Sequence, residues 1–267
     1  MINALNLDAL RERFQSAVPF PYVVIENFLD PAAARALADC YPTFDQALRD
    51  GFAFNFVNEQ RKVQISDVTK FPEPVRRLNE AISSPQFLSD LAYVTGIPRL
   101  LTDDKLSGGG MHLTGAGGRL DVHVDFNRIE EQQLFRRLNI LLYLNPEWKE
   151  DWGGQIELWD ASVKVCHQSS LPVLNRCLIF QTSDISYHGV RPVTAPPDVV
   201  RRSFAAYYYT REAPAGWTGK SHSTIFRARP DETFRGLVTM PAERLKRSIQ
   251  DGVHRTKQLV KSIIGRD

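Results

Sequence analysis

The sequence predicts an α+β protein in which a mainly helical N-terminal part packs on a β-barrel or sandwich. Helix signals are concentrated before residue 104. From Lys105 onward the pattern changes to short strands separated by Gly, Pro and Asn turns, which is typical of a barrel or sandwich. With 267 residues, 43% of them hydrophobic and 24% charged, the chain can bury one large core. We therefore expect a single domain over residues 1–267.

Helices are predicted where apolar side chains recur every three or four residues and where a capping residue precedes them. Asp30 followed by Pro31 is a strong helix start, because Asp caps the free N–H groups and Pro suits the first turn. Gly96 suits the C-terminal cap of a later helix. The predicted helices cover residues 7–14, 32–41, 73–82 and 84–96. Tyr22–Ile25 is predicted as a β-branched strand, whereas residues 51–70 favour no single structure.

The C-terminal part has a different composition. Residues 211–240 are loop-like, and Pro241 is predicted to open an amphipathic helix that ends at Ile264. From Pro241 to Asp267 there are seven Lys or Arg and three acids, a net of +4, against +2 for the whole chain. Such a helix can contact an anionic membrane, nucleic acid or a partner groove. We favour docking on its own domain or on the second copy of a homodimer. Its apolar stripe consists of Leu245, Ile249, Val253, Val260 and Ile264.

Overall composition excludes several classes of protein. The formal charge of +2 gives no indication of nucleic-acid binding. No window approaches roughly eighteen consecutive apolar residues, so no transmembrane segment is expected. Residues 1–14 include Asp8 and Glu12 and lack the apolar run of a signal peptide. The three cysteines form no Cys-x-x-Cys pair and are expected to be reduced thiols, which predicts a cytoplasmic location.

A His-x-Asp tripeptide, His123-Val124-Asp125, indicates a metal site. Side chains two residues apart on an extended segment point to the same face, so His123 and Asp125 lie together. His188, from a distant strand, is the candidate for a third ligand. Two histidines and one carboxylate on one face suit non-haem Fe(II) and leave the opposite face open.

The surrounding motifs resemble the Fe(II)/2-oxoglutarate-dependent oxygenases, in particular the prolyl 4-hydroxylase-like branch. The resemblance runs from about Gly108 to Thr210, and several motifs in the right order are more specific than any one of them. The matching stretches are Gly108–His112, Gly117–Asn127, Arg137–Pro146, Trp152–Asp160, Phe180–Asp184, Tyr187–Val193 and Arg201–Phe204.

The resemblance implies a double-stranded β-helix of the jelly-roll or cupin kind over residues 105–210, with N-terminal helices packed on one sheet. Residues 1–104 would be mainly helical support, and residues 211–267 a C-terminal loop and basic helix. Fe(II) and the cosubstrate 2-oxoglutarate are the implied cofactors, with ascorbate as a further candidate. His123, Asp125 and His188 would be the catalytic metal ligands. Relatives that transfer halide lack the metal carboxylate, so Asp125 predicts hydroxylation with release of succinate and CO2.

A buried anionic cosubstrate needs a cationic partner. Arg201 offers a planar fork of donors for a carboxylate, and Arg201-Arg202-Ser203 matches the Arg-x-Ser motif of the family. Ser203 shares the face of Arg201, whereas Arg202 points outward unless a bulge shifts the register. The resemblance assigns Tyr143 to the same carboxylate. His112 either lines the pocket near the cosubstrate or is a hydrogen-bonded barrel histidine.

Two functions remain open at the level of sequence. The first is a dioxygenase that uses O2 to hydroxylate an aliphatic C–H of a small-molecule or peptidyl substrate, such as a prolyl residue, an amino acid or a biosynthetic intermediate. The second is a non-oxidative cupin-like metal-binding protein, an isomerase, hydrolase or sensor on the same barrel. Arg201 with Ser203 favours the first, since a plain metal cupin needs no buried cationic fork.

Overall fold

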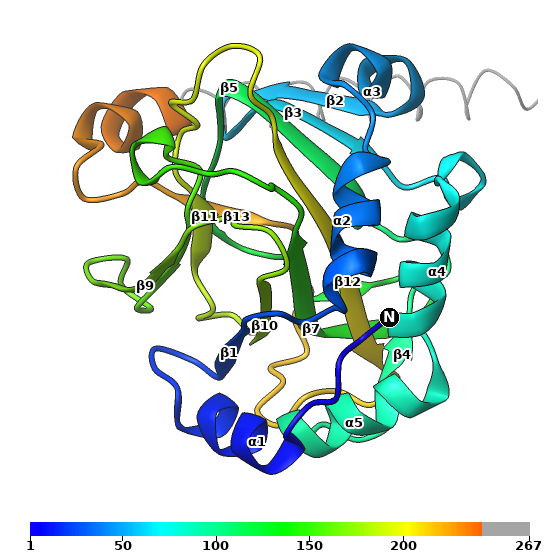
Figure 1. Cartoon of the computed structure of the whole chain (residues 1–267). Coiled ribbons are helices and arrows are strands. Elements are labelled where there is room, and N and C mark those ends of the chain that lie inside the picture. The colour runs from blue at the N-terminus through cyan, green and yellow to red at the C-terminus, as the bar shows by residue number, and fades with distance from the viewer. Residues whose placement is uncertain (242–267) are drawn as a thin grey trace, which may run out of the picture.

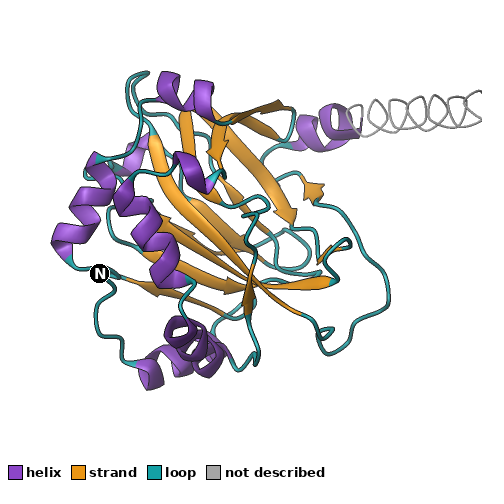
Figure 2. Cartoon of the chain, turned by 90° about the vertical axis from the view of Figure 1, so that its right-hand side faces the viewer, coloured by secondary structure: helices purple, strands orange, loops and turns teal. Residues whose placement is uncertain are grey.

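The computed structural model describes residues 1–241 and shows a strongly curled antiparallel sheet with helices on one side (Figures 1 and 2). The predicted helix from Pro241 to Ile264 lies, apart from its first residue, outside the described residues. Within the described part, thirteen strands are hydrogen-bonded into one continuous sheet, whose main path runs β1-β10-β7-β12-β5-β11-β8-β9. The strands on this path are β1 (Tyr22–Ile25), β10 (Cys177–Gln181), β7 (Leu134–Tyr143), β12 (Arg201–Thr210), β5 (Gly110–Val124), β11 (His188–Val190), β8 (Ile156–Trp159) and β9 (Cys166–Ser170).

Shorter strands extend the edges of this sheet. A hairpin of β2 and β3 joins through β3 to β5, and β13 pairs with the far end of β5. β4 pairs with β12, and β6 pairs with β7. Their bounds are β2 (Phe52–Phe56), β3 (Glu59–Ile65), β4 (Leu101–Thr102), β6 (Arg128–Ile129) and β13 (Ile225–Arg227).

The long strand β5 turns the sheet back on itself. Its first part pairs with β12 and β3, whereas its last part, Leu120–Val124, pairs with β11 and β13. Glycines permit the bend between the two parts. Gly117 has a φ of +79°, and a Cβ on Gly118 would lie 2.4 Å from the Thr114 Cγ2 atom. One strand therefore belongs to both walls of the double-stranded β-helix that the sequence predicted.

The helices cover the outer face of the wall that contains β12 and β7 (Figure 2). Along β12 the side chains alternate: Phe204 and Tyr208 pack among the helices, whereas Ser203 and Tyr207 face the barrel interior. The helices are α1 (Leu7–Ser16), α2 (Pro31–Asp39), α3 (Phe44–Asp50), α4 (Glu73–Ile82) and α5 (Pro85–Thr95), with 3-10 turns at Val68–Lys70 and Glu150–Trp152 and a π-helical turn at Arg235–Thr239.

Local capping signals in the sequence were correct. The Asp30 carboxylate accepts hydrogen bonds from the backbone N–H groups of Ala32 and Ala33 at the start of α2. Gly96 ends α5 with a φ of +72°. Strand β1 and helix α4 have the predicted bounds.

Tertiary pairing decides the structure of two segments, one that the sequence left unassigned and one that it predicted to be loop-like. Residues 51–70, which favoured no single structure, contain the β2–β3 hairpin, so the N-terminal part also contributes strands to the sheet. Residues 211–240 are not all loop-like: they contain β13 and a π-helical turn, and helical residues precede Pro241. β13 is only three residues long and forms by pairing with β5. Within residues 1–241 no helix has both the length and the apolar character needed to cross a bilayer.

Candidate metal centre

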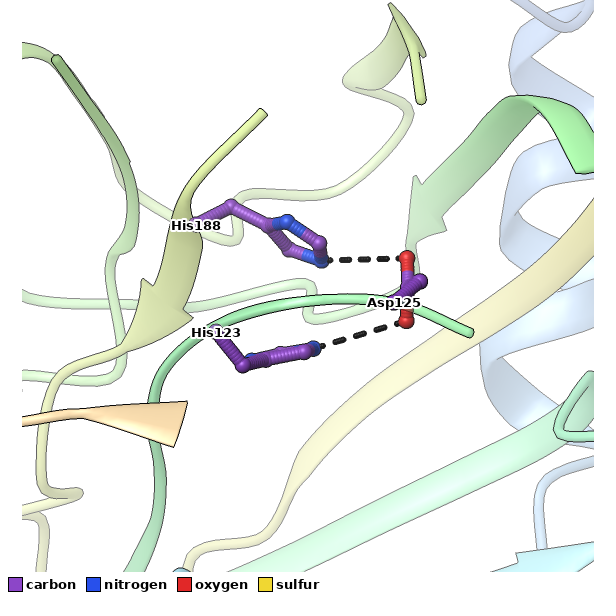
Figure 3. Close-up of side chains that lie close together, drawn as sticks. All are labelled: His123, Asp125 and His188. Carbon is purple, nitrogen blue, oxygen red and sulfur yellow. Dashed lines mark ion pairs between the residues drawn. The ribbon is translucent and has the colours of Figure 1, made fainter. Parts of the chain in front are cut away.

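The predicted metal ligands meet at one point (Figure 3). His123 and His188 lie directly opposite each other in the pairing of β5 with β11, and Asp125 follows the end of β5. The Asp125 Oδ1 atom is 3.5 Å from His123 Nε2, and its Oδ2 atom is 3.5 Å from His188 Nε2. One ligand atom from each of the three residues lies within 4.8 Å of the other two. This spacing allows all three to bind a single ion.

Both imidazoles are oriented by their own backbone. His123 Nδ1 lies 2.9 Å from the carbonyl of Asp121, and His188 Nδ1 lies 2.9 Å from the carbonyl of Ser186. A carbonyl only accepts, so each Nδ1 carries the proton and each Nε2 keeps its lone pair for a metal. Burial, and then the neighbouring His123, lower the pKa of His188 to about 3, which keeps the ring neutral and ready to ligate.

Two further side chains hold the Asp125 carboxylate. The Asn139 side-chain amide donates to Oδ2 at 2.8 Å, and the Arg136 guanidinium lies 3.1 Å from the same oxygen. Arg136 also donates from Nε to the Asn139 side-chain oxygen at 3.0 Å, and its guanidinium stacks 3.6 Å from the centre of the Tyr207 ring. Burial alone would raise the pKa of Asp125, but Arg136 and the two histidines hold it well below its usual range. Asn139 and Arg136 both contact Oδ2, so Oδ1 is the oxygen that remains available to bind a metal.

Sequence reasoning missed Arg136 and Asn139. On β7 the inward positions include Asn139 and Leu141, so strict alternation would turn Arg136 outward. A register shift in the pairing of β7 with β12, between Tyr208 and Tyr209, reverses this orientation. Such a bulge leaves no clear signal in one sequence.

Deeper in the same barrel lies an unpaired cation. Arg201 is 4% exposed and donates from Nε to the Gly154 carbonyl at 2.8 Å. Among residues 1–241 no carboxylate forms an ion pair with it. The buried Tyr143 hydroxyl has no hydrogen-bond partner in the described part, and the Arg201 guanidinium lies 5.1 Å from the centre of the Tyr143 ring. A buried guanidinium and an orphaned hydroxyl side by side suit a carboxylate ligand that the protein itself does not supply.

The other predicted cosubstrate residues lie on the same wall. Ser203 pairs across the sheet with His112 on one side and Tyr143 on the other. His112 lines the pocket, and its Nε2 atom lies 3.0 Å from the Gly108 carbonyl. Arg202 points outward and donates to the Ala38 carbonyl of α2 at 3.3 Å. Of the two neighbouring arginines, Arg201 is thus the one that faces the pocket.

A single cavity joins these groups. About 620 Å³ of empty space, partly open to solvent, is lined by the three candidate ligands together with Arg201, Ser203 and His112. Lys62, which sequence reasoning did not single out, enters the cavity from β3 and is paired with Glu59 at 2.8 Å.

Several other polar side chains and histidines of the chain have partners away from the ligand cluster. Asn127 holds the backbone of residues 220–222, and Arg191 forms ion pairs with Glu157 and Asp231. His167 is exposed, and His222 pairs with an exposed aspartate. His254 lies outside the described residues.

The fold and the site together define a metal-binding double-stranded β-helix protein with a buried site for an anionic ligand. Residues 109–209 match the model of the 2OG-Fe(II) oxygenase superfamily. A segment of 78 residues is 32% identical to prolyl 3-hydroxylase OGFOD1 of Mus musculus; it covers 28% of this chain and 14% of that relative.

Two solved structures share the fold. A Pseudomonas putida prolyl-4-hydroxylase has a TM-score of 0.51 and 18% identity, over 75% of this chain and 98% of that one. A Trichoplax adhaerens prolyl hydroxylase, solved with a peptide fragment of the hypoxia inducible factor oxygen degradation domain, has a TM-score of 0.53 and 18% identity, over 76% and 90% of the chains. At these identities the likeness establishes the architecture.

Proposed function

We propose that this protein is an Fe(II)- and 2-oxoglutarate-dependent dioxygenase that hydroxylates an aliphatic C–H bond of its substrate. One observation carries the proposal: a three-ligand cluster and a buried guanidinium, which no carboxylate of residues 1–241 pairs with, face the same cavity. A metal-binding barrel without an oxo-acid cosubstrate would have no need for the second feature, because an unpaired buried charge destabilises the fold. The same observation weighs against a non-oxidative cupin-like function.

The metal is held by His123, Asp125 and His188. Two neutral imidazoles and one carboxylate on one side of the ion are the ligand set suited to Fe(II), and the opposite side stays open to cosubstrate and O2. Asn139 and Arg136 hold the Asp125 carboxylate through Oδ2, so Oδ1 is directed at the metal.

The cosubstrate carboxylate is bound by Arg201, with Ser203 and Tyr143 beside it. Burial raises the pKa of Tyr143 to about 12, so its hydroxyl keeps its proton and donates a hydrogen bond at neutral pH. His112 lies across from Ser203 and closes the same wall of the cavity.

Bound Fe(II) supplies the oxidative chemistry, with 2-oxoglutarate leaving as succinate and CO2. The side chains of the protein hold the metal, orient the cosubstrate, exclude water and leave one coordination face free. Because Asp125 occupies the carboxylate position, the product is a hydroxylated substrate rather than a halogenated one.

A prolyl residue in a peptide or protein is the first substrate class to test, and an amino-acid-like or biosynthetic intermediate is the second. The relatives named above are prolyl hydroxylases, one of them in complex with a peptide. A cytoplasmic location belongs to the same proposal and is supported by the three cysteines, none of which forms a disulfide.

The test measures succinate formed from 2-oxoglutarate by the purified protein with Fe(II), against pooled prolyl peptides and metabolites. We expect substrate to stimulate the formation of succinate. Asp125→Ala should lower the rate of succinate formation by more than about 100-fold, because removing a metal ligand weakens metal binding more than removing a side chain that orients that ligand. Undiminished turnover in Asp125→Ala, or metal binding without affinity for N-oxalylglycine, a cosubstrate mimic, would refute the proposal.

A further inference from the structure

A largely buried network of ion pairs lies next to the metal ligands, around Asp121 and Glu157. It is centred on the segment Ile225–Arg235, here called the strap, which begins as β13 and continues past Arg229 to the π-helical turn. β13 lies beside the end of β5 (Figure 1). Phe226 pairs there with His123, and its ring is 5.4 Å from the imidazole. The strap therefore adds a strand directly next to the one that carries two ligands.

Arg229 is the centre of this network, and its side chain is fully buried. Its Nε donates to the Glu157 carboxylate at 2.7 Å, and its NH2 group lies 3.4 Å from the Leu120 carbonyl of β5. Its NH1 group is 3.9 Å from the Asp121 carboxylate. One guanidinium thus connects the strand of His123 with β8.

Among the described residues three acids form ion pairs with Arg229: Glu232 belongs to the strap itself, whereas Asp121 and Glu157 are attached to the ligand strands. Asp121, which is fully buried, accepts a hydrogen bond from His123 Nδ1 through its backbone carbonyl. Glu157 pairs across β8 and β11 with Gly189, the residue after His188. The Arg229 NH2 group would lie 3.0 Å from a Cβ at Gly189, so the guanidinium lies against the backbone of the ligand strand.

Arg235 completes the connection at the other end of the strap. Its NH2 group donates to Asp121 Oδ2 at 2.6 Å and to the Val57 carbonyl, in the β2–β3 turn, at 2.6 Å. The side chains of Asp121, Glu157 and Arg229 are at most 2% exposed, so solvent screens these charges little. Arg119 on β5 also pairs with Asp121, and Arg191 also pairs with Glu157, so the strap arginines share these two acids with cations of the barrel.

We infer that the strap is a positioning element for the metal centre, in which Arg229 and Arg235 fix the spacing of His123 and His188 through Asp121 and Glu157. This inference rests on the proposed function, because it concerns the same metal. It extends that function to a C-terminal segment that touches neither the ion nor the cosubstrate. Mutation of a side chain that orients the ligands of a metal typically lowers the affinity for the metal by about 10–100-fold.

The test is the affinity of the full chain for Mn(II), which binds such sites without oxidation, measured by calorimetry. We expect Arg229→Met to bind Mn(II) about 10- to 100-fold more weakly than the wild type. Arg227→Met is the matched control: Arg227 lies on the same strap, but is exposed, donates to the Ala161 carbonyl and stacks on Tyr187. Its affinity should stay within about twofold of the wild type, as for surface changes away from such features.

Arg235→Met provides a second, milder variant if Arg229→Met fails to fold, since the Arg235 side chain is 21% exposed. The visible spectrum of bound Co(II), which depends on ligand geometry, should change in either variant and not in the control. Folded Arg229→Met or Arg235→Met protein with wild-type Mn(II) affinity and an unchanged Co(II) spectrum would overturn the inference. A wild type that binds no Mn(II) would instead overturn the proposed function, and this inference with it.

Discussion

Arg136 lies 3.1 Å from the Oδ2 atom of Asp125, and both side chains are largely buried. The metal carboxylate thus has a permanent cationic partner inside the barrel. The Arg136 guanidinium compensates the negative charge of the buried Asp125 carboxylate before any metal binds. Because it contacts Oδ2, it leaves Oδ1 as the oxygen that can bind the metal.

Arg136→Met should destabilise the metal-free protein by about 3–5 kcal/mol, because it leaves Asp125 as an uncompensated buried charge. Mn(II) should recover part of this loss, since the ion replaces the missing positive charge. Urea unfolding with and without Mn(II) measures both effects. Arg137→Met is the control, because Arg137 donates to Thr210 on the other side of β7. Equal unfolding midpoints for Arg136→Met and the wild type would contradict the prediction.

Arg201→Ala should reduce the affinity for N-oxalylglycine by at least about 100-fold, the effect of removing one partner of a buried charge pair. Mn(II) affinity should be retained, because Arg201 contacts none of the candidate ligands. Calorimetric titration of both compounds separates the two effects. Arg202→Ala, whose side chain points to α2, should bind N-oxalylglycine like the wild type. A similar loss in both variants would place the carboxylate elsewhere.

Tyr143→Phe should separate ligand binding from stability. The Tyr143 hydroxyl is buried without a hydrogen-bond partner in the described part of the chain, so its removal should leave the free energy of unfolding unchanged or slightly raised. A hydrogen bond to a charged group contributes about 1.5–3 kcal/mol, so N-oxalylglycine should bind about 10-fold or more weakly. Unaltered binding would show that the hydroxyl does not reach the carboxylate.

His112 should make the protein sensitive to acid. Burial, together with the charge of Lys62, lowers the pKa of His112 well below its usual value, so the folded state holds the ring neutral. Below about pH 6.5 the unfolded chain takes up a proton that the native His112 does not, and stability falls as the pH drops toward the folded pKa.

At about pH 5 this contribution is at most about 2 kcal/mol. His112→Gln should therefore lose less stability than the wild type between about pH 7.5 and pH 5, as measured by urea unfolding. The exposed His167→Gln serves as the control. Identical pH dependence in His112→Gln and the wild type would count against the prediction.

Local signals in the sequence predicted the parts of this protein that depend on nearby residues. Asp30, Pro31 and Gly96 define helix ends because capping involves only adjacent backbone groups. The alternation of an extended segment correctly placed His123 beside Asp125 and turned Arg201 inward with Ser203. The strand β13 was missed, because three residues between turns carry no periodic pattern.

The sequence by itself predicted which residues can ligate a metal and that Arg201 shares a face with Ser203, because these follow from side-chain chemistry and a period of two along a strand. Only the tertiary structure decided what supports them. Arg136 reaches Asp125 through a bulge between β7 and β12, and Arg229 reaches Asp121 from more than a hundred residues away. The physical reason is that a buried charge is stabilised by an opposite charge that lies close in space. The strand pairing that brings the two together joins distant parts of the chain, so it leaves no local pattern in the sequence.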